Sequence, residues 1–168
     1  ILIIGNSNEP KGLDPHLVSG VLESNIIRAL FEGLCVEDPA IDGKALPGVA
    51  MKWTPNKEFT EWTFDLNPEA KWSDGEDVTA HDFVFSYKRM LSPDPNWPAQ
   101  YSEMLYFLKN AQEYNKGKIT DFAQVGAKAV DKHTLLLTLR GPIPYLPELT
   151  KHYTGYPVPE HIVLKHGK

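Results

Sequence analysis

Cysteine is almost absent from this 168-residue sequence. Its single cysteine, Cys35, excludes an internal disulfide, and the apolar neighbours Leu34 and Val36 predict a buried thiol without special reactivity. Long hydrophobic runs are absent too, since none approaches the roughly 20 residues of a membrane-spanning helix. The sequence begins with ILIIGNS, without methionine and without a basic and apolar leader, so we expect a mature or trimmed chain.

An excess of positive charge is also missing. The chain has 17 lysine and arginine residues against 22 aspartate and glutamate residues, which gives a formal net charge of -5. The basic residues are scattered along the sequence and form no stripe that follows a phosphate backbone. We therefore expect no nucleic-acid partner.

Motifs for catalysis and metal binding are missing as well. The six histidines form no His-Glu-x-x-His motif, His161 and His166 are poorly spaced for one helix face, and there is no Cys-x-x-Cys. A Gly-x-Ser-x-Gly elbow, a phosphate loop and a Gly-x-Gly-x-x-Gly motif are also lacking. Structural roles account for three of the carboxylates: Asp74 suits a turn, Asp82 a helix cap and Asp131 a hairpin. The sequence thus predicts no catalytic residue, no metal site and no cofactor.

A hydrophobic core is well supported. Hydrophobic residues make up 42% of the chain, and without repeats or low-complexity tracts one globular domain is the default. The segment EWTFDL, residues 61–66, alternates apolar and polar side chains and predicts a half-buried strand. The large aromatic residues near it, such as Trp62 and Phe83, are predicted core residues and not a stacking platform.

The clearest local pattern is a capped helix. Asp74-Gly75 predicts a tight turn, and Thr79 then starts a helix with Asp82 in capping-box register. Apolar residues follow at helical spacing, and Pro93 prevents continuation.

Weaker patterns predict the remaining elements. Helices are expected at residues 24–32, 101–116 and 160–168, and one helical turn at 145–149. Strands are expected at residues 2–5, 49–53, 125–130 and 135–140, and an irregular segment at 13–22. In the first helix we expect Ile26, Ile27, Leu30 and Phe31 to point inward, and in the proline-rich loop 94–99 we expect Trp97 to be exposed.

Residues 71–89 resemble a known family signature. Their sequence, KWSDGEDVTAHDFVFSYKR, matches KWSDGxxVTAxDFVxSxxR of the family 5 solute-binding proteins, the peptide-binding receptors of bacterial ATP-driven importers. Other segments resemble the same family in the same order: LDPH at 13–16, ESNI at 23–26, LFEGL at 30–34, PGVA at 47–50, KHTL at 132–135, PIPY at 142–145 and PVP at 157–159. The oligopeptide-binding receptors are the members that it resembles most.

The resemblance implies an α+β fold, a mixed β-sheet with flanking helices. This is the amino-terminal part of a two-lobed, type II periplasmic-binding-protein fold. Family members are several times longer, so we expect a fragment. Residues 1–35 would be an incomplete segment of the first ligand-binding lobe, residues 36–159 the small α+β domain, and residues 160–168 the start of the return to the first lobe.

The resemblance also implies a ligand site. It matches Ser19, Gly20 and Val21 with a segment whose backbone pairs with an extended peptide, a β-augmentation that gives affinity without reading side chains. It matches Tyr101 and His152 with residues that line the cleft. Without the resemblance, residues 19–20 are a turn before a helix, Tyr101 is a core tyrosine and His152 has no assigned role.

The predicted function is that of an extracytoplasmic binding component of an ABC-type oligopeptide importer. Such a protein is periplasmic, or lipid-anchored in a Gram-positive bacterium, and it delivers its peptide ligand to a membrane permease. We expect a monomer without enzymatic activity. The alternatives are a receptor of the same family for a nickel chelate, a cell-wall peptide or an oligosaccharide, a sensor or adhesion module, and a small enzyme, for which no acid, base and nucleophile set is present.

Overall fold

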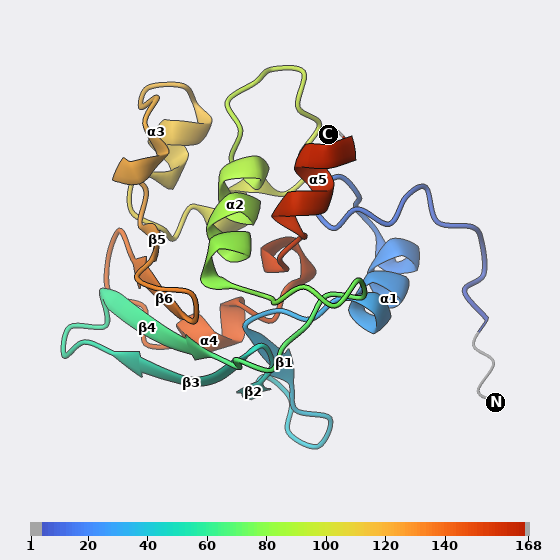
Figure 1. Ribbon diagram of the computed structural model, residues 1–168, viewed down its shortest axis with the longest axis horizontal. Coiled ribbons are helices and arrows are strands. Elements are labelled where there is room, and N and C mark those ends of the chain that lie inside the picture. The colour runs from blue at the N-terminus through green and yellow to red at the C-terminus, as the bar shows by residue number, and fades with distance from the viewer. Residues whose placement is uncertain (1–4, 167–168) are drawn as a thin grey trace.

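The computed structural model describes residues 5–166 and has the predicted α+β class (Figure 1). The strands are β1 (Cys35–Glu37), β2 (Ala45–Pro47), β3 (Ala50–Pro55), β4 (Glu61–Leu66), β5 (Ala127–Ala129) and β6 (Thr134–Thr138). The α-helices are α1 (Val21–Leu30), α2 (Ala80–Met90), α3 (Ala111–Asn115), α4 (Leu146–Leu149) and α5 (Glu160–His166). Three 3-10 helices lie at Ser102–Leu105, Phe122–Gln124 and Tyr153–Gly155. Of the expected strand 2–5, only Gly5 lies within the described residues, and it belongs to no strand.

The main sheet has the strand order β3-β4-β6-β5, and β1 pairs with β2 in a separate ribbon. Within residues 5–166 each strand pair is antiparallel, so the sheet is antiparallel where a mixed one was expected. Two of the three pairs in the main sheet are hairpins: β3 joins β4, and β5 joins β6, through short loops, which permit only antiparallel pairing.

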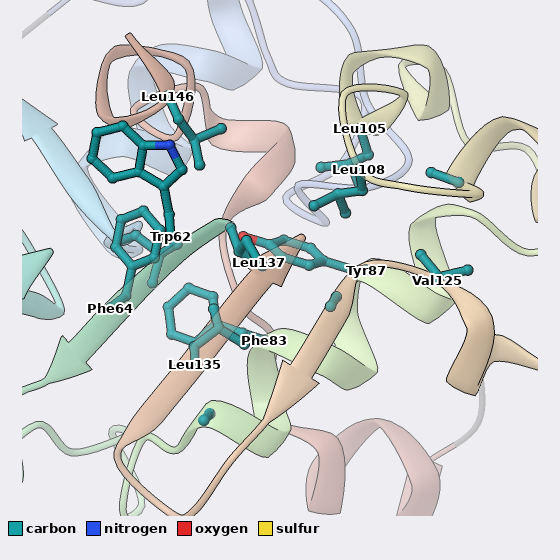
Figure 2. Packing of buried hydrophobic residues seen from close by; sticks show 14 of the residues in the cluster. Trp62, Phe64, Phe83, Tyr87, Leu105, Leu108, Val125, Leu135, Leu137 and Leu146 are labelled. Carbon is teal, nitrogen blue, oxygen red and sulfur yellow. The ribbon is translucent and has the colours of Figure 1, made fainter. Parts of the chain in front are cut away.

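The core lies between this sheet and α2, as Figure 2 shows. The alternation in β4 places Trp62, Phe64 and Leu66 on the buried face, as predicted. Leu135 and Leu137 of β6 lie beside them, and α2 covers the layer with two aromatic rings. Phe83 and Tyr87 of α2 are both nearly inaccessible to solvent, and their ring centroids lie 6.4 Å apart.

The predicted start of α2 is confirmed in detail. The Thr79 hydroxyl accepts a hydrogen bond from the Asp82 backbone N–H, and the Asp82 carboxylate accepts one from the Thr79 backbone N–H at 2.8 Å. This capping box satisfies two amide groups that the helix itself leaves without partners. Cys35 is also buried as expected, and burial raises the pKa of its thiol to about 11, so the thiol is unreactive at neutral pH.

Helix α1 differs from its prediction at its start and on its inner face. It begins at Val21, three residues before the expected start, because Gly20 adopts φ +128° and turns the chain directly into the helix. Ile27 is fully buried as predicted, but the inward prediction for Leu30 is wrong, since its side chain is 62% exposed. Of the residues in α1, only Glu23 and Ile27 are buried.

The predicted single helix at residues 101–116 is wrong. Between the 3-10 helix at 102–105 and α3, the backbone pairs with the sheet edge: Lys109 N–H donates to the Thr138 carbonyl, and Gly126 N–H donates to the Lys109 carbonyl, both at 2.9 Å. Asn110 then adopts a left-handed conformation with φ +59°. A Cβ atom at position 126 would lie 1.9 Å from the Thr138 oxygen, so only glycine permits this close approach.

A second, smaller cluster of buried residues joins the amino-terminal segment to the carboxy-terminal one. It consists of Val18, Ile27, Tyr153 and Tyr156, with Phe31 and Tyr101 packed partly against it. In Figure 1 this region, around α1, lies to the right of the sheet. Between residues 5 and 166, no helix combines the length and the apolar character that crossing a bilayer requires.

Candidate functional site

Three segments that are distant in sequence meet beside the small cluster. The ring of Tyr101 stands edge-on to His152, with ring centroids 6.1 Å apart, and edge-on to Tyr153 at 6.3 Å. The Tyr153 hydroxyl donates to the carbonyl oxygen of Val18 at 3.4 Å. Tyr153 therefore connects Val18, the residue directly before the predicted segment 19–21, with the predicted side chains Tyr101 and His152.

His152 is held by the short helix that it begins. Its Nδ1 accepts a hydrogen bond from the Thr154 N–H at 3.4 Å and lies 2.9 Å from the Thr154 hydroxyl. Burial lowers the pKa of His152, and the positive charge of Arg28 lowers it further. The imidazole is thus neutral at physiological pH, and the accepting Nδ1 leaves its proton on Nε2. A neutral ring with an Nε2–H group is a hydrogen-bond donor for a polar ligand.

Residues 19–21 form an exposed backbone corner. Each of the three is exposed, and the side chain of Val21 is 74% accessible. Because Val21 is the first residue of α1, its N–H has no intrahelical partner, whereas the Gly20 carbonyl accepts from Ser24 at 3.1 Å. The corner thus offers backbone donors at a helix start, and it is not an extended strand.

The glycine in this corner is required by its conformation. At φ +128° a residue with a Cβ atom is strained, and that atom would lie 2.9 Å from Oε2 of Glu23. The Glu23 carboxylate is fixed there because it accepts a hydrogen bond from the Lys11 backbone N–H at 3.0 Å.

Pockets are small at this surface. A pocket of about 30 Å³ lies beside His152, between Tyr87 and Phe107. A wider concavity of about 850 Å³ lies elsewhere, between α1, β1 and residues 67–78, and none of the five predicted site residues lines it. We therefore define the candidate site by the convergence of residues 19–21 with Tyr101 and His152 and not by cavity volume.

The site has a partly buried ionic support that the sequence did not predict. Asp14 pairs with Arg89 of α2, and His16 lies against both of them. Asp14 and His16 lie in the segment LDPH, and Arg89 ends the signature of residues 71–89, so all three residues lie in segments that resemble the family. No spacing rule, however, pairs side chains that are so far apart in the chain. Tyr153 was missed for the same reason.

The described residues offer no metal site. Within residues 5–166, no group of three or more histidine, cysteine, aspartate or glutamate side chains is placed to hold a metal ion. What the arrangement offers is hydrogen bonding and aromatic contact: backbone donors, two tyrosines and a neutral imidazole.

Comparison with known proteins identifies the family. Residues 44–166 match the model of "Bacterial extracellular solute-binding proteins, family 5 Middle". The chain is 45% identical to the periplasmic oligopeptide-binding protein OppA of Salmonella typhimurium, over 99% of this chain and 30% of that protein. It is 41% identical to the periplasmic murein peptide-binding protein MppA of Escherichia coli, over 90% of this chain and 27% of that protein.

Solved structures agree with this result. The crystal structure of Haemophilus influenzae OppA in complex with RPPGFSPFR superimposes with a TM-score of 0.89 at 41% identity, covering 97% of this chain and 31% of that one. The chain spans about 30% of the length of the curated relatives that it matches. Because the family model covers most of the sequence and the fold agrees, the chain belongs to family 5 of the bacterial extracellular solute-binding proteins.

Proposed function

We propose that this chain is part of an extracytoplasmic receptor that captures oligopeptides and delivers them to the membrane permease of an ABC-type importer. The longer protein of which it would be a part is called the full-length protein below. Two relatives are named for peptide binding, and a third is solved in complex with RPPGFSPFR, which supports this proposal. Within the chain, the supporting features are the hydrogen-bonding groups and aromatic rings at the candidate site.

The observation that carries the proposal is the meeting of an exposed backbone corner with aromatic rings. Val18, directly before the corner, accepts a hydrogen bond from Tyr153, and Tyr101 contacts both Tyr153 and His152. An extended peptide presents an amide and a carbonyl at each residue, so backbone donors capture it whatever its side chains are. In this proposal Ser19, Gly20 and Val21 pair with the ligand backbone, while Tyr101 and His152 line the ligand site.

The proposal assigns the parts of the chain to two lobes. Residues 1–35 belong to a ligand-binding lobe, residues 36–159 form the small α+β domain, and residues 160–168 return towards the first lobe. Ligand capture is then closure of the lobes around the peptide, in which the ligand stabilises the closed state. Because most of the cleft would lie outside this chain, we expect the 168 residues alone to bind tripeptides weakly or not at all. A tight calorimetric affinity would contradict this assignment.

The similarity to a murein peptide-binding protein favours one second candidate, a receptor for cell-wall peptides. Both candidate receptors would bind the backbone of a peptide, and they differ in the range of peptides that the protein accepts.

Mass spectrometry of ligands released from the full-length protein separates the candidates. The protein is purified without refolding and then denatured, so that ligands acquired in the cell are recovered. We expect a ladder of short peptides of mixed sequence. A single cell-wall peptide would favour the second candidate, and a metal chelate, a sugar or no ligand would contradict both. The same preparation from a Tyr101→Ala variant is the control, and we expect it to release less peptide.

A further inference from the structure

A partly buried ionic contact ties the segment before residues 19–21 to helix α2. The carboxylate of Asp14 accepts two hydrogen bonds from Arg89, at 3.0 Å from Nη1 and 2.6 Å from Nη2. The same carboxylate accepts a hydrogen bond from the backbone N–H of His16 at 2.9 Å. A bidentate pair fixes direction as well as distance. Residues 14–16 are therefore oriented by a side chain of the small domain.

His16 strengthens this anchor. Its Nδ1 lies 2.7 Å from Nη1 of Arg89, and its Nε2 lies 3.1 Å from the carbonyl oxygen of Tyr156. Arginine can only donate, so Nδ1 must be the acceptor and Nε2 must carry the proton. The imidazole is 1% exposed and thus bridges α2 to the segment before α5 as a neutral ring.

The surroundings of Arg89 suit a guanidinium and no other cation. Its side chain is only 7% exposed, and the ring of Trp97 covers it at 4.5 Å from the guanidinium carbon. Trp97, expected from the sequence to be exposed, is half-buried for this reason. A lysine at position 89 keeps the charge but loses both the planar stacking and the forked donation to Asp14.

Only two residues separate this anchor from the candidate site. Leu17 and Val18 follow His16, and Val18 is buried in the small cluster, where its carbonyl accepts from Tyr153. The backbone is thus held at Asp14 and again at Val18. Residues 19–21 leave this fixed segment directly, so a shift of the anchor moves them relative to Tyr101 and His152.

We propose that Arg89, acting through Asp14 and His16, is a positioning residue for the ligand site. It does not touch the peptide; it holds residues 19–21 where their backbone groups meet the ligand. This inference rests on the proposed peptide-binding function. It extends the role of α2 from scaffold to a determinant of how the backbone corner is presented.

The test uses the full-length protein with Arg89→Lys, Asp14→Asn and, as matched control, Arg140→Lys, because Arg140 is exposed and belongs to neither cluster. The probes are trialanine and its analogues methylated on single backbone nitrogens. Calorimetry gives the affinity for each probe, and hydrogen–deuterium exchange of the ligand-free protein reports on residues 17–22.

We expect Arg89→Lys to weaken trialanine binding by about tenfold or more, since misplaced backbone donors lose their hydrogen bonds. We also expect it to reduce the affinity ratio between trialanine and the methylated analogue and to accelerate exchange in residues 17–22. A role in stability alone would lower both affinities by the same factor. That result, or binding equal to wild type, overturns the inference.

Two further outcomes are distinguishable. If wild-type protein binds no peptide probe, the proposed function fails before the role of Arg89 is tested, and the exchange experiment then decides whether Arg89 positions residues 17–22. If Arg89→Lys does not fold, Asp14→Asn, which keeps one acceptor, replaces it, with the same expected reduction in affinity ratio and the same contradicting result.

Discussion

The ring of Tyr101 stands at 87° to the ring of His152, with 6.1 Å between the ring centroids. Each residue lies at the start of a 3-10 helix, Ser102–Leu105 or Tyr153–Gly155. Two short helices thus bring together two rings that we propose to line the ligand site. Edge-to-face contact orders both rings before a ligand arrives, which reduces the entropy lost on binding.

Removal of the Tyr101 ring should weaken peptide binding. In the full-length protein, we expect Tyr101→Ala to lower the affinity for trialanine by about tenfold, because a half-buried ring contact and its ordering of His152 are lost. Tyr101→Phe keeps the ring and should retain most of the affinity, and calorimetry measures both. Equal losses in the two variants would contradict a role of the ring and would point to the hydroxyl.

Substitution of Gly20 should damage the backbone corner. Gly20→Ala places a side chain at φ +128° and 2.9 Å from Glu23, so we expect a loss of roughly 1–3 kcal/mol in unfolding free energy and weaker peptide binding. Gly141→Ala is the matched control, because nothing lies within 4 Å of a Cβ atom there and its φ is not positive. Urea denaturation and calorimetry compare the variants. A wild-type affinity in a folded Gly20→Ala protein would refute the pairing role of this corner.

Acid should destabilise the protein through His16. Burial lowers its pKa from 6.5 to about 4, and the charge of Arg89 acts in the same direction. Since the folded-state pKa lies below the unfolded one, the unfolded chain takes up the proton first as the pH falls. The contribution of His16 is therefore constant above about pH 6.5 and lost between pH 6.5 and 4, by up to roughly 3 kcal/mol.

Asp14, which faces His16, contributes to the pH dependence of stability in a lower pH range. Burial opposes ionisation of Asp14, but the hydrogen bonds and the charge of Arg89 outweigh it and lower the pKa of Asp14. Its stabilising effect is present above pH 3.8 and disappears as the pH falls through its folded-state pKa. Urea denaturation from pH 7 to 4 measures this. We expect the unfolding free energy to fall less with decreasing pH in His16→Asn than in wild type, and to fall as in wild type in His81→Asn, whose histidine is exposed on α2. The same pH dependence of the unfolding free energy in wild type and His16→Asn would contradict the role assigned to His16.

Loss of the α2 cap should cost stability without affecting ligand contacts. Thr79→Ala removes the acceptor for the Asp82 N–H, and we expect the unfolding free energy to fall by roughly 1 kcal/mol. Thr120→Ala, at an exposed position outside any helix or strand, is the control and should change it by less than about 0.5 kcal/mol. The midpoint of urea unfolding measures both. No difference between the two variants would contradict a stabilising capping box.

The sequence predicted those elements whose pattern is local. The alternation in β4 and the Thr79–Asp82 cap depend on residues within one turn or one strand, and both are confirmed. The helix expected at residues 101–116 failed because Lys109 and Gly126 pair across the sheet edge, a contact between distant residues that helical periodicity does not reveal. The prediction that Leu30 points inward was wrong, because amphipathic spacing does not show which other segments pack against the helix.

The candidate site shows the same limit. The five site residues came from family resemblance, and the structure brings Tyr101 and His152 together while Tyr153 connects them to Val18. Their role in ligand binding remains a prediction. The pairing of Asp14 with Arg89 could not be predicted, because a bidentate contact between distant segments depends on how the folded chain places them.

The most direct test of the account is the affinity of the full-length protein for trialanine, compared with analogues that carry a methyl group on one backbone nitrogen and with tripeptides of other side chains. Backbone-directed capture predicts that methylation at a paired nitrogen weakens binding by about tenfold or more, while changes of side chain alter it much less. Affinity that follows the side chains and ignores backbone methylation would contradict capture at the corner formed by Ser19, Gly20 and Val21.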